Sequence, residues 1–313
     1  MSTEPSGRAK LIFECEIMKK RNQKATEHNR RSQLGLILFR FRKNKLAVIS
    51  VFFLIFIAIV ILSAPLYIDY DKAITMNTAE AFQSPSWEHP FGTDLYGRDM
   101  LARVIYGGRI SLFAGMCIIL LSFIFGVMIG SVAGFFGGWI DAVLSRITDI
   151  FFALPMLLGA IVVLQMFKTS KSIWKIVLVL TLFGWVGVCR IARSAVLKSK
   201  NLEFNTASTA LGSTPARNLF RHILPNSLAP IIVIATTSLA SYIVAEATLS
   251  FLGVGLPTTT VSWGGDISSA QTNLQTDPLV LFYPSAALAI TVLAFIMMGD
   301  AVKDALDPKS RTA

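Results

Sequence analysis

Residues 46–66 read LAVISVFFLIFIAIVILSAPL, an uncharged apolar run that follows a polar and basic stretch, residues 1–45. About 20 consecutive apolar residues are what a helix needs to cross the hydrocarbon core of a bilayer. A signal peptide would instead carry a shorter apolar core at the very N-terminus, followed by a small-residue cleavage site. The run therefore predicts a first membrane span that is retained in the mature protein.

The composition extends this interpretation to the whole chain. Of the 313 residues, 53% are hydrophobic and 15% are charged, and the mean hydropathy is +0.60. A water-soluble chain of this length could not bury so much apolar surface, so we expect an all-α integral membrane protein. The sequence predicts six transmembrane helices, at residues 46–66, 110–133, 142–167, 173–188, 227–252 and 282–298.

The positive charges predict the orientation of these spans. The net charge is +10, and with six spans 22 of the 29 Lys and Arg residues fall on the side that holds both termini. By the positive-inside rule, both termini are expected in the cytoplasm. The basic run at residues 40–45 could contact nucleic acid or anionic lipid; because a span starts at the next residue, we favour a topogenic anchor.

Motifs that carry catalytic or metal chemistry are missing from the sequence. Cys15, Cys117 and Cys189 are far apart and form no CxxC or Cys/His spacing, which disfavours a disulfide scaffold and a zinc site. The chain has no GxxxxGK[ST] loop, nucleophile elbow or HExxH motif. We therefore expect no catalytic residues and no enzyme activity of the chain by itself.

Residues 67–108 form a long connection that contains HPFGTDLYGRD at positions 89–99. Its Pro and Gly residues predict a capped turn, and the apolar periodicity that follows predicts a short amphipathic helix on the outer face, with Asp99 and Arg103 on its polar side. A metal site formed by His89, Asp94 and Asp99 is the less favoured alternative. Further along, Gly126, Gly130, Gly134 and Gly138 recur every four residues and predict a close helix contact without chemistry.

Between the fourth and fifth spans, residues 201–224 predict a helical hook. Asn201 is the expected N-cap of its first helix, and Gly212 suits the end of that helix. Thr214 and Pro215 predict the start of a second helix over 216–224, which Pro225 would close. The small face Ala207, Ser208 and Ala210 fits a groove on another protein, and an ordinary surface loop is an equal alternative.

The same segment resembles the EAA loop of ABC importer permeases. EFNTASTALG at 203–212 and FRHILPN at 220–226 have the spacing of that motif, with Gly212 six residues after Thr206 and Pro225 thirteen after Gly212. The resemblance implies a coupling helix that docks on a cytoplasmic ATPase. The residues it assigns to coupling are Glu203, Thr206, Ala207, Ser208, Leu211, Gly212, Arg217, Arg221 and Pro225.

Three further blocks resemble the second, C-type permease of the oligopeptide, dipeptide and nickel branch, so the resemblance covers residues 39–313. They are HPFGTDLYGRD, EATLSFLGVG at 246–255 with SWG at 262–264, and DALDP at 304–308. The family motif in the first block comprises Phe91, Gly92, Thr93, Asp94, Gly97, Arg98 and Asp99.

The resemblance implies a subunit of a type I ABC importer in the bacterial cytoplasmic membrane. The expected partners are a second homologous permease, two ATPases that bind ATP and Mg, an extracytoplasmic binding protein and the lipid bilayer, with no cofactor on this chain and no nucleic acid. Peptides are the expected substrates, with nickel or metallophore complexes, glutathione and other small solutes as alternatives. The implied parts are a basic tail (1–45), a first helix (46–66), an outer loop (67–108), a five-helix domain (109–302) and a C-terminal tail (303–313).

A secondary transporter driven by an ion gradient is the competing class. It would be expected to carry several midplane carboxylates or an inverted repeat, and only Glu246 lies deep in a predicted span. Glu246 could line the path or form a structural contact, and we favour the structural role. The sequence also departs from the family: the EAA triplet reads Thr206, Ala207, Ser208, so its glutamate is lost, and whether Glu203 replaces it is open.

Overall fold

The computed structural model describes Gly35, Phe39 and residues 41–167, 172–257 and 259–306. Most of the two predicted tails, with Asp307 and Pro308 of the last motif, lies outside the described residues. Within these ranges the β pairing is a single bridge between Thr93 and Asp99. The long helices are α3 (Lys45–Ser63), α5 (Met100–Phe136), α6 (Gly138–Ala153), α7 (Met156–Met166), α8 (Ile173–Lys200), α11 (Leu224–Phe251) and α13 (Pro278–Leu306). The short ones are η1 (Ala64–Leu66), α4 (Asp71–Ile74), η2 (Thr78–Glu80), α9 (Glu203–Ala210), α10 (Pro215–Arg217), a π-helix (Asn218–Ile223) and α12 (Trp263–Gln271).

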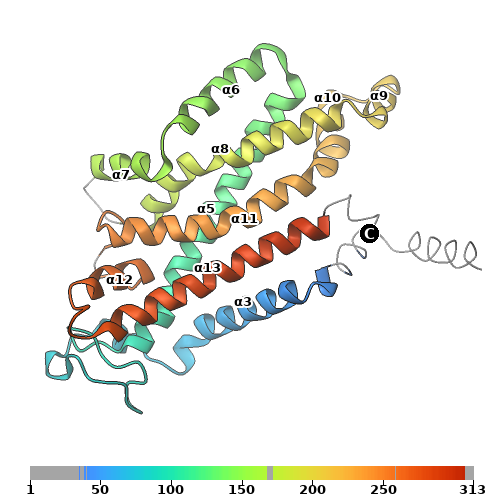
Figure 1. Cartoon of the computed structure of the whole chain (residues 1–313). Coiled ribbons are helices and arrows are strands. Elements are labelled where there is room, and N and C mark those ends of the chain that lie inside the picture. The colour runs from blue at the N-terminus through green and yellow to red at the C-terminus, as the bar shows by residue number, and fades with distance from the viewer. Residues whose placement is uncertain (1–34, 36–38, 40, 168–171, 258, 307–313) are drawn as a thin grey trace, which may run out of the picture.

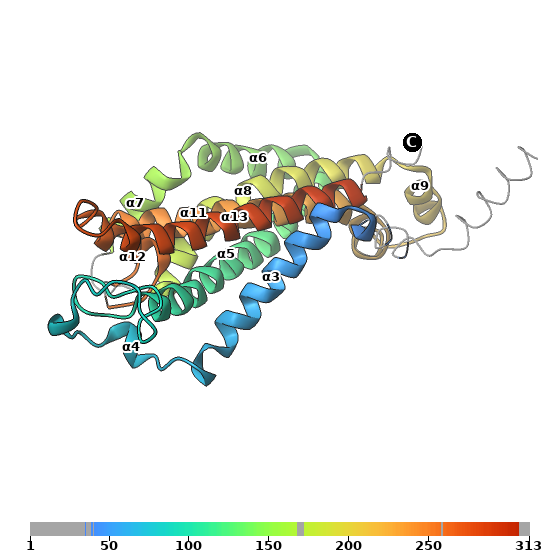
Figure 2. The same ribbon diagram turned by 60° about the horizontal axis from the view of Figure 1, so that its bottom comes forward.

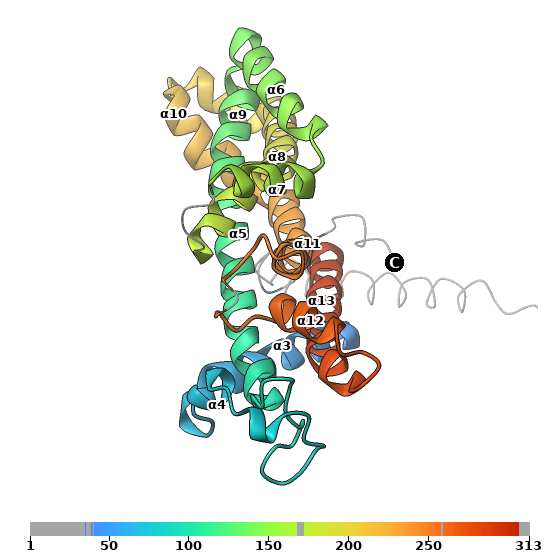
Figure 3. The ribbon, with the colours of Figure 1, turned by 90° about the vertical axis from the view of Figure 1, so that its left-hand side faces the viewer.

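The long helices form an elongated bundle with two distinct ends (Figure 1). The hook end carries α9, α10 and the start of α3, and the loop end carries residues 67–99, α7 and α12. Helix α5 packs most extensively on α8, α11 packs on α5, α8 and α13, and α3 packs on α13. Viewed from the loop end, α6 lies at one edge of the bundle and α4 at the other (Figure 3).

Among the described helices, α3, α5, α8, α13 and the continuous run Pro215–Phe251 are long and apolar enough to cross a membrane. The third predicted span, 142–167, is not one straight helix: α6 and α7 meet at an angle of 87°. Leu154 is extended, with φ −88° and ψ 125°, because Pro155 follows it and disfavours the helical conformation of the preceding residue. The described residues therefore contain five candidate spans, or six if the bent pair is one broken span.

The amphipathic helix expected on the outer face is instead the first part of α5. Gly107 and Gly108 do not interrupt α5, since both pack against Trp263 of α12. The side predicted to be polar is also buried, because Arg103 is only 4% exposed. Asp99, expected on the polar side of that helix, instead precedes it as the N-cap, with its Oδ1 accepting a hydrogen bond from Ala102 N at 2.7 Å.

The close helix contact predicted from the four glycines that recur every four residues is confirmed for three of them. A Cβ atom on Gly126 would lie 2.7 Å from the Val188 Cβ, and one on Gly130 or Gly134 would clash with a backbone carbonyl of α8. The prediction is wrong for Gly138, which begins α6 at φ +56° and would meet nothing within 4 Å. The three remaining glycines let the backbones of α5 and α8 approach closely.

Candidate functional site

The first arm of the hook is α9, which projects beyond the bundle (Figure 2). Asn201 was expected to cap it, but Asn201 ends α8, since its backbone N–H donates to Ser199 O; Leu202 precedes α9 instead. Gly212 has φ +80°, the left-handed conformation that suits the end of a helix. Thr214 caps the second arm as predicted, its hydroxyl accepting from Arg217 N at 3.4 Å.

The second arm does not end at Pro225. After one turn, α10 becomes the π-helix 218–223, which leads directly into α11, and Leu224 N–H donates to Leu219 O five residues back. This wider turn places Pro225 in the first turn of α11, where its missing N–H is tolerated. Two neighbouring apolar residues of the π-helix differ in burial: Leu219 is 4% exposed and Phe220 is 67% exposed.

Buried Asn218 joins the two arms. Its Oδ1 accepts a hydrogen bond from the Ser208 hydroxyl at 2.7 Å, and its Nδ2 donates to Thr209 Oγ1 at 3.0 Å. Asn205 ties the first arm to the end of α8, because its Nδ2 donates to Lys200 O at 2.8 Å. Ser208, one of the departures from the EAA pattern, therefore helps to hold the hook together.

The hook is also anchored in the bundle. Val196 of α8 packs on Leu219 and Ile223 of the π-helix. The Ser227 hydroxyl donates to Ser199 Oγ at 2.9 Å. Lys200 Nζ donates to Phe135 O, at the end of α5, at 2.6 Å. These contacts tie the hook to α8 and α11, and α8 in turn to α5.

The side chains predicted to couple to an ATPase lie on the surface of the hook. Leu211 is 88% exposed, and in the described structure neither Arg217 nor Arg221 has an acidic partner. Ser208 is half-buried against Asn218. The remaining residues of the set are exposed: Glu203, Thr206, Ala207, Gly212 and Pro225.

The HPFGTDLYGRD motif has the opposite character, because its polar side chains are buried and paired. Asp94 Oδ1 accepts from the backbone N–H groups of Tyr96 and Arg98, each at 2.9 Å. Arg98 Nε donates to Asp94 Oδ2 at 2.7 Å. Phe91 stacks on Tyr283 of α13 with ring centroids 4.2 Å apart. The motif builds a rigid loop and attaches it to α13.

His89, Asp94 and Asp99, the alternative metal ligands, do not converge on one point. His89 Nδ1 and Asp99 Oδ2 share a hydrogen bond of 2.8 Å, whereas Asp94 turns toward Arg98. No cluster of three metal-ligating side chains occurs in the part of the chain that the structure describes. The geometry therefore favours the predicted capped turn and helix start.

A buried ion pair joins α5 to α12 at the loop end. Arg103 Nε donates to Asp266 Oδ1 at 2.9 Å, and a second guanidinium nitrogen contacts the same oxygen. The remaining guanidinium nitrogen donates to Ala73 O at 2.7 Å. Burial raises the pKa of Asp266 to about 6, against the opposing attraction of Arg103. The pair therefore carries a large desolvation penalty, which makes each partner dependent on the other.

Glu246 lies in α11, near the loop end, and is fully buried. Its Oε1 accepts a hydrogen bond from the Ser250 hydroxyl one turn later, at 2.8 Å. Its Oε2 has no hydrogen-bond partner among the described residues. Glu246 thus faces protein rather than an open channel within this subunit.

Sequence reasoning missed two residues that organise these sites. Asn218 and Asp266 are polar residues that the structure buries. The signal for Asp266 was its position four residues after the helix cap Ser262, in an otherwise uncharged block. No local signal pairs it with Arg103, because the two lie 163 residues apart in the sequence.

Comparisons with known proteins agree with this architecture. Residues 126–312 match the family described as binding-protein-dependent transport system inner membrane component, and residues 32–85 match the N-terminal TM domain of oligopeptide transport permease C. The oligopeptide transport system permease protein OppC of Bacillus subtilis is 40% identical over 88% of this chain and 89% of its own length. The dipeptide transport system permease protein DppC of the same organism is 39% identical over 87% of this chain and 84% of its own.

A chain of the MetNI methionine ABC transporter, in an inward-facing conformation, superposes with a TM-score of 0.56. It is 20% identical and covers 66% of this chain and 98% of that one, so the likeness concerns the fold alone, a type I permease fold. The first family model spans more than half of the chain, and the two relatives span most of it. The chain therefore belongs to the binding-protein-dependent transport system inner membrane component family, as a transport permease subunit of the oligopeptide transport permease C type.

Proposed function

We propose that this chain forms half of the membrane path of an ATP-driven importer that takes up peptides delivered by an extracytoplasmic binding protein. The observation that carries the proposal is the hook: its predicted coupling residues, apart from the half-buried Ser208, are exposed, while hydrogen bonds and packing join its two arms to each other and to the bundle. The names of the curated relatives, an oligopeptide and a dipeptide permease, support peptides over nickel complexes, glutathione or other solutes.

The hook would transmit closure of the ATPases to the membrane spans. Leu211 and Phe220 offer apolar side chains to a groove, and Arg217 and Arg221 offer positive charges to acidic residues around it. Because the π-helix continues into α11, a force on the hook acts directly on that span. Such a transmission is a rigid-body movement and does not require the hook to change its own structure.

The lost glutamate of the EAA triplet limits which salt bridge can form with the ATPase. Thr206 occupies its position and is exposed, but it carries no charge. Glu203 lies three residues earlier, in the first turn of α9, and is exposed as well. Residues three apart lie on neighbouring parts of a helix surface, so Glu203 can supply the carboxylate close to the original place.

The proposed complex contains a second homologous permease, two ATPase subunits, the binding protein and the lipid bilayer, and no nucleic acid. ATP and Mg belong to the ATPases, and this chain binds no cofactor and catalyses no reaction. We place the complex in the bacterial cytoplasmic membrane. The hook and both termini then face the cytoplasm, and the loop end faces the binding protein.

For Glu246 we propose a structural role, because its carboxyl group is enclosed by protein and bonded to Ser250. A Glu246→Gln variant keeps the size of the side chain and its ability to accept the Ser250 hydrogen bond. We expect normal assembly and normal peptide uptake. Normal assembly with strongly reduced uptake would assign Glu246 to the path instead.

The central test is uptake of a labelled peptide by the complete importer in proteoliposomes. We expect uptake to require ATP and the binding protein and to persist when ion gradients are dissipated. Uptake driven by an ion gradient through this chain alone would support the competing secondary transporter and reject the importer.

A glycine pair tests the part played by the hook. Gly212 and Gly187 both have open space where a Cβ atom would lie, but only Gly212 of the two has a positive φ. Gly212→Val should therefore distort the hook and abolish uptake in an assembled complex, whereas Gly187→Val should leave uptake close to the wild-type level. Equal uptake by the two variants would contradict a coupling role for the hook.

A further inference from the structure

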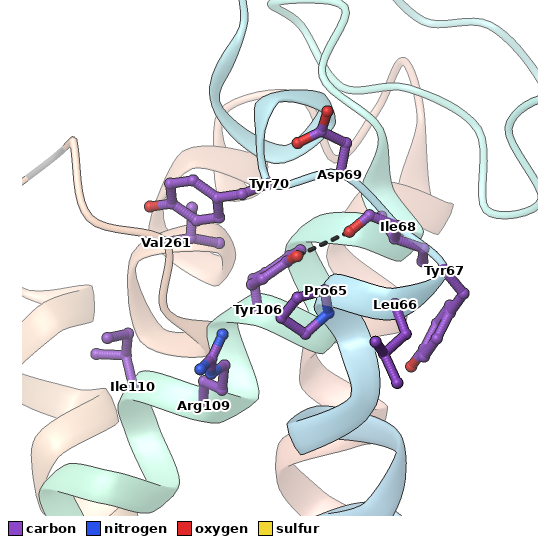
Figure 4. A pocket seen from close by; sticks show the side chains of 10 residues that line it. All are labelled: Pro65, Leu66, Tyr67, Ile68, Asp69, Tyr70, Tyr106, Arg109, Ile110 and Val261. Carbon is purple, nitrogen blue, oxygen red and sulfur yellow. Dashed lines mark hydrogen bonds between the residues drawn. The ribbon is translucent and has the colours of Figure 1, made fainter.

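A cavity opens at the loop end, between the end of α3 and the start of α5 (Figure 4). Its volume is about 710 Å³, within the range of roughly 300–1,000 Å³ that small-molecule sites occupy. Tyr67, Tyr70 and Tyr106 contribute aromatic walls, and Arg109 contributes the positive charge. No part of the hook or of the HPFGTDLYGRD motif lines this cavity.

The tyrosine walls are held in place. Tyr106 donates its hydroxyl hydrogen to Ile68 O at 2.7 Å, and Tyr67 donates to Val60 O at 2.6 Å. Tyr70 meets Tyr106 edge to face, with ring centroids 5.0 Å apart. These contacts join the segment after α3 to α5, so the cavity does not have to be assembled by an incoming molecule.

Arg109 differs from the other two arginines at the loop end. Arg98 and Arg103 are buried and paired with Asp94 and Asp266, whereas Arg109 is exposed and has no hydrogen bond or ion pair among the described residues. In Figure 4 its guanidinium group points from α5 toward Tyr106 and Tyr70. Asp69, the acid among the lining residues, lies beyond the two tyrosines from it. The cavity therefore contains a cation that forms no ion pair with the acid in its own walls.

We propose that this cavity is a substrate contact in which Arg109 binds the terminal carboxylate of a peptide and the tyrosines contact its side chains. A guanidinium binds a carboxylate through two parallel hydrogen bonds, and tyrosine offers a broad surface that accepts many side chains. The cavity lies at the end of the subunit that receives peptide from the binding protein. The proposal rests on the proposed function and adds to it the place and chemistry of an entry site.

Crosslinking in the complete importer identifies what occupies the cavity during transport. Tyr70 can be replaced by p-benzoylphenylalanine, because it is exposed and its hydroxyl makes no hydrogen bond within the described structure that the substitution would remove. We expect illumination during turnover with a radiolabelled tripeptide to attach the tripeptide to this position, and mass spectrometry to locate the adduct. An adduct with phospholipid or with the second permease only, or no adduct in a complex that transports the tripeptide, would overturn the proposal.

Variants of Arg109 test the chemistry of the contact. At a tripeptide concentration below saturation, Arg109→Gln should lower the yield of tripeptide adduct about tenfold. Arg109→Lys should lower the yield less, because lysine keeps the charge but not the two parallel hydrogen bonds. Lys72→Gln is the matched control, since Lys72 is an exposed cation at the same end that does not line the cavity.

A C-terminally amidated tripeptide changes the other partner of the contact, because it lacks the terminal carboxylate. It is added at high concentration to compete with the labelled tripeptide. It should compete weakly in the wild type, and Arg109→Gln should abolish the preference for the free carboxylate. An unchanged preference would overturn the proposal while leaving peptide uptake intact. A complex that takes up no peptide at all would instead reject the proposed function.

Discussion

The two ends of this molecule use their signature residues in opposite ways. At the hook end, Arg217 and Arg221 lie on the surface without acidic partners among the described residues, and neutral hydrogen bonds through Asn218 hold the two arms together. At the loop end, Arg98 of the HPFGTDLYGRD motif and Arg103, which follows the motif, are buried in ion pairs within the subunit. The residues of a family motif can thus either form a surface that binds another chain or stabilise their own subunit, and the burial of their side chains distinguishes the two cases. Substitutions at the loop end should therefore change stability, and those on the hook surface should change coupling.

The largest loss of stability is expected for Arg103→Ala. The change leaves the buried Asp266 carboxylate without its counter-ion, which typically costs about 3–5 kcal/mol. The free energy of unfolding can be measured by denaturation of the purified protein in detergent. The matched control is Arg217→Ala, which removes an exposed arginine outside any described ion pair and should change the free energy of unfolding by less than about 0.5 kcal/mol.

A double replacement separates a buried charge from lost packing. Arg103→Met combined with Asp266→Leu removes both charges and keeps apolar volume, so it should recover most of the stability that Arg103→Ala loses. If Arg103→Ala unfolds like the wild type, the contrast between the two ends is wrong.

A smaller loss is expected for Gly130→Ala, which acts on the contact between α5 and α8 that connects the two ends. The new methyl group would clash with the Cys189 carbonyl, and separating two packed helices typically costs about 1–3 kcal/mol. Gly187→Ala is the matched control, because that glycine of α8 has no atom within 4 Å of the added carbon. Denaturation in detergent should show a lower stability for Gly130→Ala alone; equal stabilities would contradict the predicted close contact.

Much of the fold followed from the sequence because each step depended on a local pattern. Apolar runs located the spans, and the four-residue glycine spacing predicted the packing of α5 on α8. Gly212 and Thr214 marked a helix end and a helix start from their own conformational preferences. The resemblance, on four ordered motifs, predicted the family that the comparisons confirm.

The remaining features depend on contacts between distant segments, or on the backbone conformation around a residue, and a local sequence pattern predicts neither. Pro155 bends α6 against α7, whereas Pro225 continues a helix, because a π-helix precedes only the second of them. The expected outer helix continues into α5 without a break, and Gly107 and Gly108 there pack against Trp263 of the distant α12. The partner of Arg103 and the tyrosines around Arg109 come from distant segments, so neither site could be assembled from the sequence.

Within the hook, Asn218→Ala should lower stability by about 1 kcal/mol, because it removes both hydrogen bonds that join the arms. Ser208→Ala restores the residue of the EAA pattern and removes only one of these bonds, so its loss should be smaller. The ratio of peptide transported to ATP hydrolysed checks the consequence: it should fall more for Asn218→Ala than for Ser208→Ala. The reverse order would show that the arms are not joined through Asn218.

The smallest effect on stability is expected for Leu211→Ser. This side chain is 88% exposed at the tip of the hook and contacts little of its own subunit, so the free energy of unfolding should stay within about 0.5 kcal/mol of the wild type. An apolar side chain that fills a partner's groove nevertheless contributes to binding, and its removal should weaken retention of the ATPases by the permease pair. Copurification of the ATPases and ATP-dependent uptake measure this loss, with Leu202→Ser as the control for an exposed leucine at the base of the hook. If Leu211→Ser lowers stability as much as Gly130→Ala does, the hook tip is an internal support, and the distinction between the two ends fails.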